Sequence, residues 1–183
     1  MVFTTAFASA LIEPIYLIFL KNKFDLALPV LAALFLPAGL VHAVLPKYSG
    51  QWSDRWGRAP LIALGVTLAG LVSMALPWWP VVWLIALSYI VFAVGWAMAS
   101  PAVDALAADL APEHARGTVL GMKEAAMGLG AATGPIIGGL IYEYWSQELA
   151  FALNGLLLIL TAGFVLTVLR KSTNAHSAGG VEA

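Results

Sequence analysis

The stretch GQWSDRWGRAP, residues 50–60, decides the fold because it places three charged side chains between two long apolar runs. The charged residues are Asp54, Arg55 and Arg58. An Asp or Arg at the centre of a bilayer costs about 2.5 to 3.5 kcal/mol on insertion scales, so this stretch must lie at the water boundary. We therefore predict that the apolar runs on either side are membrane-spanning helices joined by a short charged hairpin.

Composition independently excludes an ordinary water-soluble domain. Hydrophobic residues make up 61% of the chain, charged residues make up 10%, and the mean hydropathy is +0.89. Soluble domains carry roughly 25% charged residues. The net charge of -1 gives no electrostatic reason to expect a nucleic acid partner, and the absence of Cys excludes disulfides and thiol catalysis. The fold class predicted is an all-α integral membrane protein.

Six apolar runs are long enough to cross a bilayer, which requires about 20 residues per helix. They cover residues 2–20, 26–46, 61–79, 81–110, 118–142 and 149–169. We predict one six-helix transmembrane domain over residues 1–171, followed by a polar tail over residues 172–183. An even number of spans places both ends of the chain on one side of the membrane.

Basic residues are distributed unequally between the two sides that these spans create. One side would hold Lys47, Arg55, Arg58, Arg116, Lys123, Arg170 and Lys171, and the other only Lys21 and Lys23. Because cytoplasmic loops carry the excess of Lys and Arg, we expect both termini in the cytoplasm and the protein in the plasma (inner) membrane.

The charged hairpin has two interpretations that its spacing leaves open. Gly50 allows a close helix approach, and Gly57 supplies the backbone freedom for a tight turn. Asp54 can accept hydrogen bonds from a helix terminus, while Arg55 and Arg58 present forked donors to carboxylates. Such a cluster is either a latch that holds one arrangement of the bundle and releases it in another, or a basic turn that only sets topology.

A second charged segment, DALAADLAPEHAR at residues 104–116, falls on the same side as the hairpin. We predict that it is a loop and that the two segments form ion pairs. Two pairings are expected: Arg55 or Arg58 with Asp109 or Glu113, and Asp54 with Arg116 or a helix end.

The first span contains a carboxylate, Glu13, followed by a proline. Ser9, Glu13 and Tyr16 share one helical face, which turns the carboxylate toward two possible hydrogen-bond partners. An ionisable residue inside a membrane is a functional hypothesis by default. Since burial disfavours its charged form, Glu13 either couples proton binding to helix position or pairs with a cationic substrate. The structural alternative is a Glu satisfied by a neighbouring helix or by water.

The fifth span carries a run of small residues around a proline. The residues of this run are Gly130, Gly134, Pro135, Gly138 and Gly139. Glycines four residues apart let helices approach backbone to backbone, and a proline bends a helix at such a contact. The alternative is tight packing with no further role.

Several other polar or aromatic residues in the spans are more typical of structural roles. Tyr89 and Trp96 share a face of the fourth span, where packing is commoner than substrate contact. His42 lies near the hairpin, where we expect an interfacial residue. Lys123 and Glu124 open the fifth span, where we expect a boundary pair rather than a cavity lining.

Three motifs resemble those of the major facilitator superfamily of transporters. The hairpin matches G-x-x-x-D-R-x-G-R, and residues 101–121 contain P-A-x-x-A-L-x-A-D-L-x-P followed by R-G-x-x-x-G. The fifth span matches G-x-x-x-G-P-x-x-G-G, which resembles the run found in drug:proton antiporters. The resemblance implies proton-coupled export of a small organic or drug-like solute, with no metal or organic cofactor.

Members of this family have two six-helix halves with the substrate site between them, so the chain resembles one half. The fourth span lacks an Arg four residues before Gly95, which favours the C-terminal half. The partners expected are the lipid bilayer, a solute, protons, and either a second half or another copy of the chain. The alternative is a truncated or non-transporting membrane scaffold that needs a partner half. No G-x-S-x-G, H-E-x-x-H or G-x-x-x-x-G-K-[ST] motif supports an enzyme.

Overall fold

The computed structural model describes residues 1–179, and over these residues it is a bundle of six long helices without strands. The helices are α1 (Val2–Phe24), α2 (Leu28–Trp56), α3 (Arg58–Ala75), α4 (Val82–Leu110), α5 (Arg116–Tyr144) and α6 (Gln147–Gly179). Two single 3-10 turns, η1 (Leu76–Trp78) and η2 (Glu113–Ala115), follow α3 and α4. All six helices are long and apolar enough to cross a membrane, as expected of an all-α multi-pass membrane protein.

The connections at the charged end are shorter than the sequence predicted. Helix α2 continues through Pro46 to Trp56, so Gly57, with φ of 92°, is the one residue that separates α2 from α3. Likewise, residues 104–110 are the last turns of α4 and not a loop. A polar sequence beyond the bilayer keeps its backbone hydrogen bonds by remaining helical, so the helix need not end where the apolar run ends.

Two further boundaries are set by local chemistry. Helix α1 ends at Phe24, and the capping residue Asp25 adopts the left-handed conformation, with φ of 47°, that short polar side chains tolerate. Helix α6 continues past residue 171, where we expected the tail to begin, as far as Gly179. Its apolar part ends at Val168, and the last part of the expected tail, residues 180–183, lies outside the described residues.

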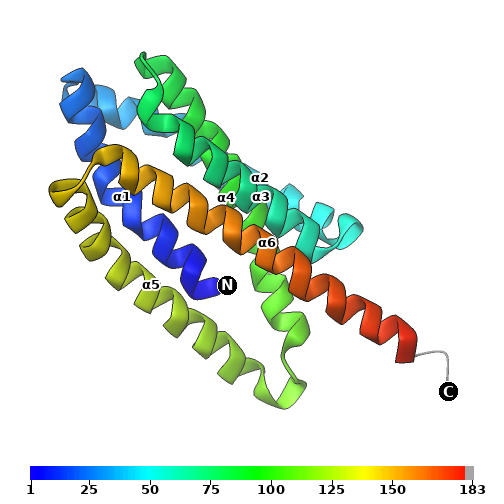
Figure 1. Cartoon of the computed structure of the whole chain (residues 1–183). Helices are drawn as coiled ribbons and strands as arrows, with labels where there is room; N and C mark the ends of the chain where they lie inside the picture. The colour runs from blue at the N-terminus through cyan, green and yellow to red at the C-terminus, as the bar shows by residue number, and fades with distance from the viewer. Residues whose placement is uncertain (180–183) are drawn as a thin grey trace.

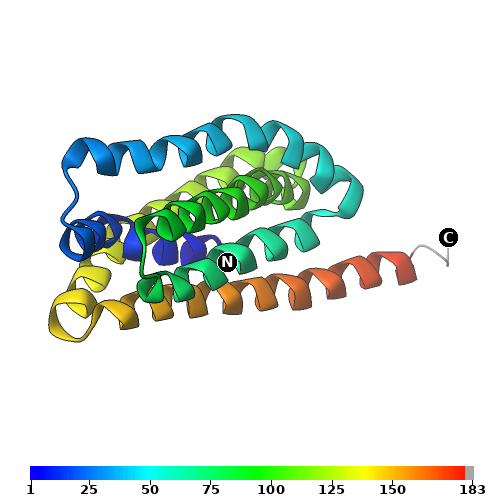
Figure 2. The same ribbon diagram turned by 90° about the horizontal axis from the view of Figure 1, so that it is seen from above.

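The helices pack in the spatial order α5, α1, α6, α3, α4, α2, each against the next (Figure 1). The row is curved, and α2 and α6 lie on opposite sides of the bundle (Figure 2). Helices α1 and α2 make few contacts with each other, as do α4 and α5. The bundle is therefore tightly packed around α3 and loosely joined on the side where the α1–α5 pair faces the α2–α4 pair.

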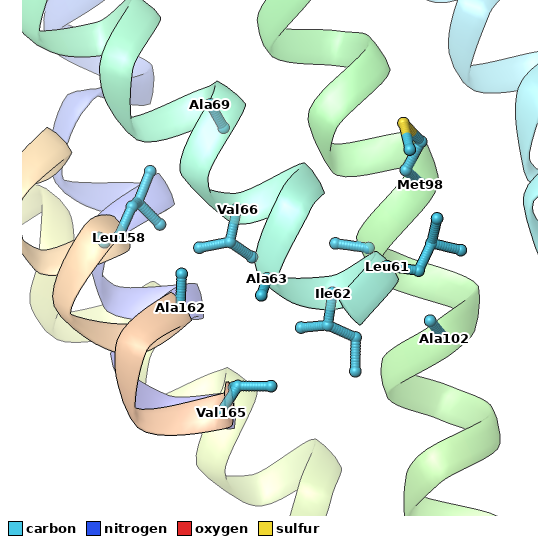
Figure 3. Packing of buried hydrophobic residues seen from close by; sticks show 12 residues of the cluster. Leu61, Ile62, Ala63, Val66, Ala69, Met98, Ala102, Leu158, Ala162 and Val165 are labelled. Carbon is cyan, nitrogen blue, oxygen red and sulfur yellow. The ribbon is translucent and has the colours of Figure 1, made fainter. Parts of the chain in front are cut away.

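Helix α3 lies at the centre of the tight side, between α4 and α6 (Figure 3). Its residues Ile62 and Val66 are buried against Ala99 of α4 and Leu158 of α6. Glycines permit the close approach: a Cβ at Gly65 would strike the carbonyl oxygen of Gly95 on α4. On the other side of α3, a Cβ at Gly70 would lie 2.9 Å from the carbonyl oxygen of Gly155 on α6.

Helix α5 packs on α1 through three of the four predicted glycines. A Cβ at Gly134 would lie 2.8 Å from the carbonyl oxygen of Phe7, and a Cβ at Gly130 or Gly138 would come still closer to the α1 backbone. Gly139 has no atom within 4 Å of an added Cβ, so its assignment to the packing set was wrong. Successive residues of a helix point about 100° apart, which turns Gly139 away from the face that touches α1.

Candidate functional site: a cavity on the open face

A cavity of about 530 Å³ lies on the loosely joined side of the bundle. Helices α1, α2, α4 and α5 supply most of its wall, with a smaller contribution from α3 and η1. The lining residues are Ala6, Ser9, Ala10, Ile12, Glu13, Tyr16, Phe35, His42, Ser73, Leu76, Tyr89, Phe92, Trp96, Glu124, Met127, Gly128 and Ala131. This volume is in the range of pockets that hold drug-sized molecules.

One end of the cavity combines a carboxylate with a cluster of aromatic rings. Glu13 of α1 lines this end beside Tyr16, which is three residues further along the same helix. The Tyr16 ring lies 5.0 Å from the ring of Tyr89 and 5.7 Å from the ring of Phe35. Phe35 and Tyr89 meet edge to face at 4.7 Å. These separations are those of interacting aromatic pairs, so three helices are joined here by rings.

The cavity lining also contains a second carboxylate, Glu124 of α5, as well as His42 of α2 and Trp96 of α4. Lys123 Nζ lies 2.8 Å from Glu124 Oε1 and 2.6 Å from Asp104 Oδ1 on α4. The Lys123 side chain is only 11% exposed and bridges α4 and α5. Glu124 therefore already has a positive partner within the protein.

The two carboxylates are far apart along the cavity. The glycine contacts align α1 and α5 in the same direction, with Gly130 beside Phe3 and Gly138 beside Leu11. Glu13 is thus level with the Gly138 end of the contact, and Glu124 lies beyond the Gly130 end. At 1.5 Å per residue, their backbones are separated by about 20 Å along the helix axis.

The predicted set Ser9, Glu13 and Tyr16 does line one cavity, but it forms no hydrogen-bonded group. Ser9 Oγ donates to the carbonyl oxygen of Thr5 at 3.0 Å, within its own helix. Among the hydrogen bonds of the described side chains, none reaches Glu13, which is exposed to the hollow. The expected hydrogen-bond partners were therefore wrong, since Ser9 satisfies its hydroxyl within the helix and Tyr16 packs among rings.

Four cavity residues had been assigned to other roles. Tyr89, Trp96, His42 and Glu124 all line the hollow, although the sequence favoured packing, an interface or a boundary pair. Lys123 and Glu124 do form the expected pair, but Glu124 also faces the cavity. Tyr89 and Trp96 are spaced to share one face of α4, and this spacing was the one sequence feature that could have identified these two residues as part of the cavity lining.

A charged cluster joins three helices at the end of the bundle that carries the N-terminus. Arg58 lies at the start of α3. Its Nη1 is 2.5 Å from Asp54 Oδ1 on α2, and its Nε is 3.0 Å from Asp109 Oδ2 on α4. The pairing of Arg58 with Asp109 is one of the expected alternatives, which also included Arg55 and Glu113. The pairing of Asp54 with Arg116 was wrong, because Arg58, which lies just across the Gly57 turn from the end of α2, occupies the carboxylate of Asp54. In the described part of the chain, no ion pair involves Arg55, Glu113 or Arg116.

Metal binding has no support within the described residues, where no group of three His, Asp or Glu side chains lies close enough to hold an ion. The cavity instead offers two separated carboxylates, one imidazole and an aromatic wall. Such an arrangement can hold a small organic molecule and exchange protons with it or with water.

The chain is similar in sequence to known proteins of one family. The family model described as Major Facilitator Superfamily matches residues 1–182. Tetracycline resistance protein, class E, of Escherichia coli is 31% identical over 150 residues, which cover 80% of this chain and 35% of that protein. Methyl viologen resistance protein SmvA of Salmonella typhimurium is 36% identical over 126 residues, covering 68% of this chain and 25% of that protein. Multi-drug resistance efflux pump PmrA of Streptococcus pneumoniae is 30% identical over 178 residues, which cover 91% of this chain and 42% of that protein.

Proposed function

The chain belongs to the major facilitator superfamily, and we propose that it forms one six-helix half of a secondary transporter that exports small organic solutes in exchange for protons. The family is one of transporters, not enzymes, and the matched relatives are named for drug resistance or drug efflux. The observation that carries the proposal is the cavity, which is lined by four helices and bounded by a carboxylate at either end. A solute site of this kind is expected at the interface of the two halves of such a transporter.

We propose that a second six-helix unit completes the cavity. The chain spans between 25% and 42% of the length of the relatives described above. Only 11% of the spanning window of α2 and 22% of that of α5 are buried within the bundle, against 50% for α3. The unit that covers these two helices is either a separate N-terminal half or another copy of this chain, and the chain itself corresponds to the C-terminal half.

Glu13 is the residue proposed to bind the transported proton or to balance the charge of the solute. It lines the cavity without a hydrogen-bond partner among the described side chains, so its carboxylate is available to a proton or a solute. A carboxylate that binds a proton in one state and releases it in another couples proton movement to the conformation of the bundle.

The charged cluster at the N-terminal end is proposed to act as a conformational latch. Arg58 contacts carboxylates on α2 and α4 at once, so a movement of α2 relative to α4 must break one of these ion pairs. The charges are partly exposed, with 26% of the Arg58 side chain accessible, and can be released at low cost. Gly57 supplies the turn between α2 and α3. Gly50 has no atom within 4 Å of an added Cβ, so the close helix approach expected there was wrong within the described bundle.

We propose that both termini and the latch face the cytoplasm, as the excess of basic residues predicts. The chain has no Cys, so single cysteines can be introduced without background labelling. A membrane-impermeant maleimide applied to intact cells should label Ser146→Cys, between α5 and α6, but not Glu113→Cys. Labelling of Glu113→Cys in intact cells would reverse the proposed orientation.

The decisive test combines assembly with transport. The mass of the purified protein in detergent is compared with that of the 19.3 kDa chain, to detect a partner half or a second copy. The assembly is then reconstituted into vesicles, and movement of tetracycline and methyl viologen, the solutes for which two relatives are named, is measured under an imposed proton gradient.

Proton-driven movement that Glu13→Gln abolishes supports the proposal. The matched control is Glu143→Gln, which alters an exposed carboxylate of α5 outside the cavity lining and should leave transport unchanged. A stable assembly that moves neither solute under the imposed proton gradient would favour a scaffold without transport activity.

A further inference from the structure

The last part of α2, residues 47–56, carries a basic row that belongs neither to the cavity nor to the ion pairs of the charged cluster. The row consists of Lys47, Gln51 and Arg55, which are four residues apart and therefore lie one above another along the helix. All three residues are exposed, and in the described part of the chain no ion pair involves Lys47 or Arg55. Two positive charges are thus left open to the surroundings of the helix.

The basic row points away from the helix on which α2 packs. Ser49 and Ser53 are buried, and Ser49 Oγ donates to the carbonyl oxygen of Ala97 on α4 at 2.8 Å. Gln51 and Arg55 each follow one of these serines by two residues, which turns them about 200° from the serine side. The row therefore lies on the side of α2 opposite to α4.

The row also points away from the cavity. Phe35 and His42 are the α2 residues in the cavity lining, and they precede Ser49 by fourteen and seven residues. Seven residues make almost two full turns, so all three lie on nearly the same side of the helix. Helix α2 lies at the edge of the bundle (Figure 2). A second unit that closes the cavity would therefore leave the basic row facing lipid.

An aromatic row runs beside the basic row. It consists of Tyr48, Trp52 and Trp56, each of which directly follows a member of the basic row, and all three are exposed. The rings of Trp52 and Trp56 stack with their centroids 6.3 Å apart. Exposed Tyr and Trp side chains are typical of the membrane–water interface, where their amphipathic rings lie at the level of the lipid headgroups.

The length of α2 independently places both rows at that level. The spanning segment begins at Pro29, and the hydrocarbon core takes up about 20 helical residues, which end near Tyr48. Lys47 then lies at the edge of the hydrocarbon and Arg55 about 12 Å further out, at 1.5 Å per residue. Long basic side chains bend toward the headgroups, so both charges can reach one phosphate group between them.

We propose that the basic row binds the phosphate of an anionic phospholipid, while the aromatic row packs against the glycerol and the upper acyl chains of that lipid. Charge complementarity favours an anionic headgroup, because a zwitterionic one would bring a further positive charge to Lys47 and Arg55. Asp54, the one carboxylate in this part of α2, is already paired with Arg58 at 2.5 Å. The lipid site requires only that the chain spans a membrane, and is independent of transport and of a partner half.

Two lipids with the same acyl chains and different headgroups test the proposal. Binding of phosphatidylglycerol and of phosphatidylcholine to the purified protein in neutral detergent is measured by native mass spectrometry. We expect phosphatidylglycerol to bind at least about fivefold more tightly, the gain expected from one basic residue beside an anionic lipid. Equal affinities would overturn the proposal.

A competitor distinguishes a lipid from a free phosphate. Glycerol 3-phosphate, at the same concentration as the lipid, should leave phosphatidylglycerol binding unchanged, because it lacks the acyl chains that the aromatic row contacts. If it displaces the lipid, the row is a site for soluble anions and the assignment to a phospholipid is wrong.

Variants then locate the charge. Lys47→Gln and Arg55→Gln should each weaken phosphatidylglycerol binding about fivefold, and the double variant should bind the two lipids equally within about twofold. The exchange of Lys47→Arg with Arg55→Lys keeps both charges and should retain the preference.

The matched control combines Lys21→Gln with Arg116→Gln, which removes two exposed basic side chains from other parts of the chain. Its preference for phosphatidylglycerol should equal that of the original protein. If the control loses as much of the preference as the double variant at positions 47 and 55, total charge decides the binding and the proposed site is refuted. Circular dichroism and gel filtration establish that each variant is folded, and either single variant tests the row where the double variant does not fold.

Discussion

The two sides of this bundle are built from the same kind of apolar helix but packed in opposite ways. Around α3, glycines of facing helices touch, and half of the spanning window is buried within the chain. On the side of α2 and α5, most of the window is exposed and the polar and titratable groups collect around a cavity. The difference indicates that the tight side holds the bundle together, while the open side is left available for solute and a partner.

The packing of α1 connects these two sides. Helix α1 lies against α6 on the tight side and against α5 beside the cavity, and it carries Glu13. Its position depends on the glycines of α5 and on Asn154 of α6, whose Nδ2 donates to the carbonyl oxygen of Ala8. Substitutions at these contacts show how strongly each side is held.

The largest effect is expected at the contact of α3 with α4. Gly65→Val places a side chain against the carbonyl oxygen of Gly95 and 3.2 Å from Ala99 Cβ, where the backbone has no room to move. We expect a loss of about 3 kcal/mol in unfolding free energy, the upper range for overpacking. Thermal unfolding in detergent, followed by circular dichroism, measures it.

The control for this change is Gly39→Val on α2, where no atom lies within 4 Å of an added Cβ. We expect its unfolding free energy to remain within about 0.5 kcal/mol of the original. Equal losses at both positions would contradict the distinction between the tight and open sides.

A smaller effect is expected where α5 meets α1. Gly134→Ala would bring a methyl group to 2.8 Å from both Phe7 O and Ala10 Cβ and should cost about 1 to 2 kcal/mol. Gly139→Ala, five residues along the same helix, meets open space and should be neutral or stabilising by up to about 1 kcal/mol, since alanine favours helix more than glycine. Chemical denaturation of the two variants measures their unfolding free energies. A larger loss of unfolding free energy for Gly139→Ala than for Gly134→Ala would contradict the prediction.

Asn154 tests the polar contact between α6 and α1. Its side chain is fully buried, and Asn154→Ala removes the hydrogen bond to Ala8. We expect a loss of about 1 kcal/mol, the usual net contribution of one such bond. Thr167→Ala, at an exposed position of the same helix, serves as control and should have no measurable effect on thermal unfolding. A stabilising Asn154→Ala would mean that the Oδ1 atom, which has no partner, outweighs the bond made by Nδ2.

The smallest effect on stability is expected at the charged cluster. Arg58→Gln removes both ion pairs, yet exposed pairs contribute only about 0.2 to 1 kcal/mol and are screened by salt. The difference in melting temperature between this variant and the original should shrink as salt is raised from low to high concentration. A large, salt-independent loss would show that the cluster is a structural support rather than a releasable latch.

Much of the fold was predictable because membrane insertion depends on local composition. The six apolar runs became six helices, and the pairing of Arg58 with Asp109 followed from two charged segments at the same end. The limits of α2 and α4 were not predictable in this way. Hydropathy marks where the lipid ends, but backbone hydrogen bonding carries these helices past that point.

The candidate site was only half predictable. Glu13 drew attention because a carboxylate in an apolar run is costly wherever that helix lies. Glu124 and His42 did not, because the sequence placed each near the end of an apolar run, where a polar residue has an ordinary explanation. Their place in the cavity follows from the rotation of α2 and α5 about their own axes, which the sequence of one helix does not specify.

The amino-acid sequence by itself determined the number of helices, their apolar nature and the end at which most charges gather, since these depend on each residue's own affinity for lipid or water. The tertiary structure alone decided which glycines touch, that Gly139 does not, and that Lys123 of α5 pairs with Asp104 of α4. Those outcomes depend on contacts between residues distant in the chain, and such contacts are fixed only when all six helices are packed together.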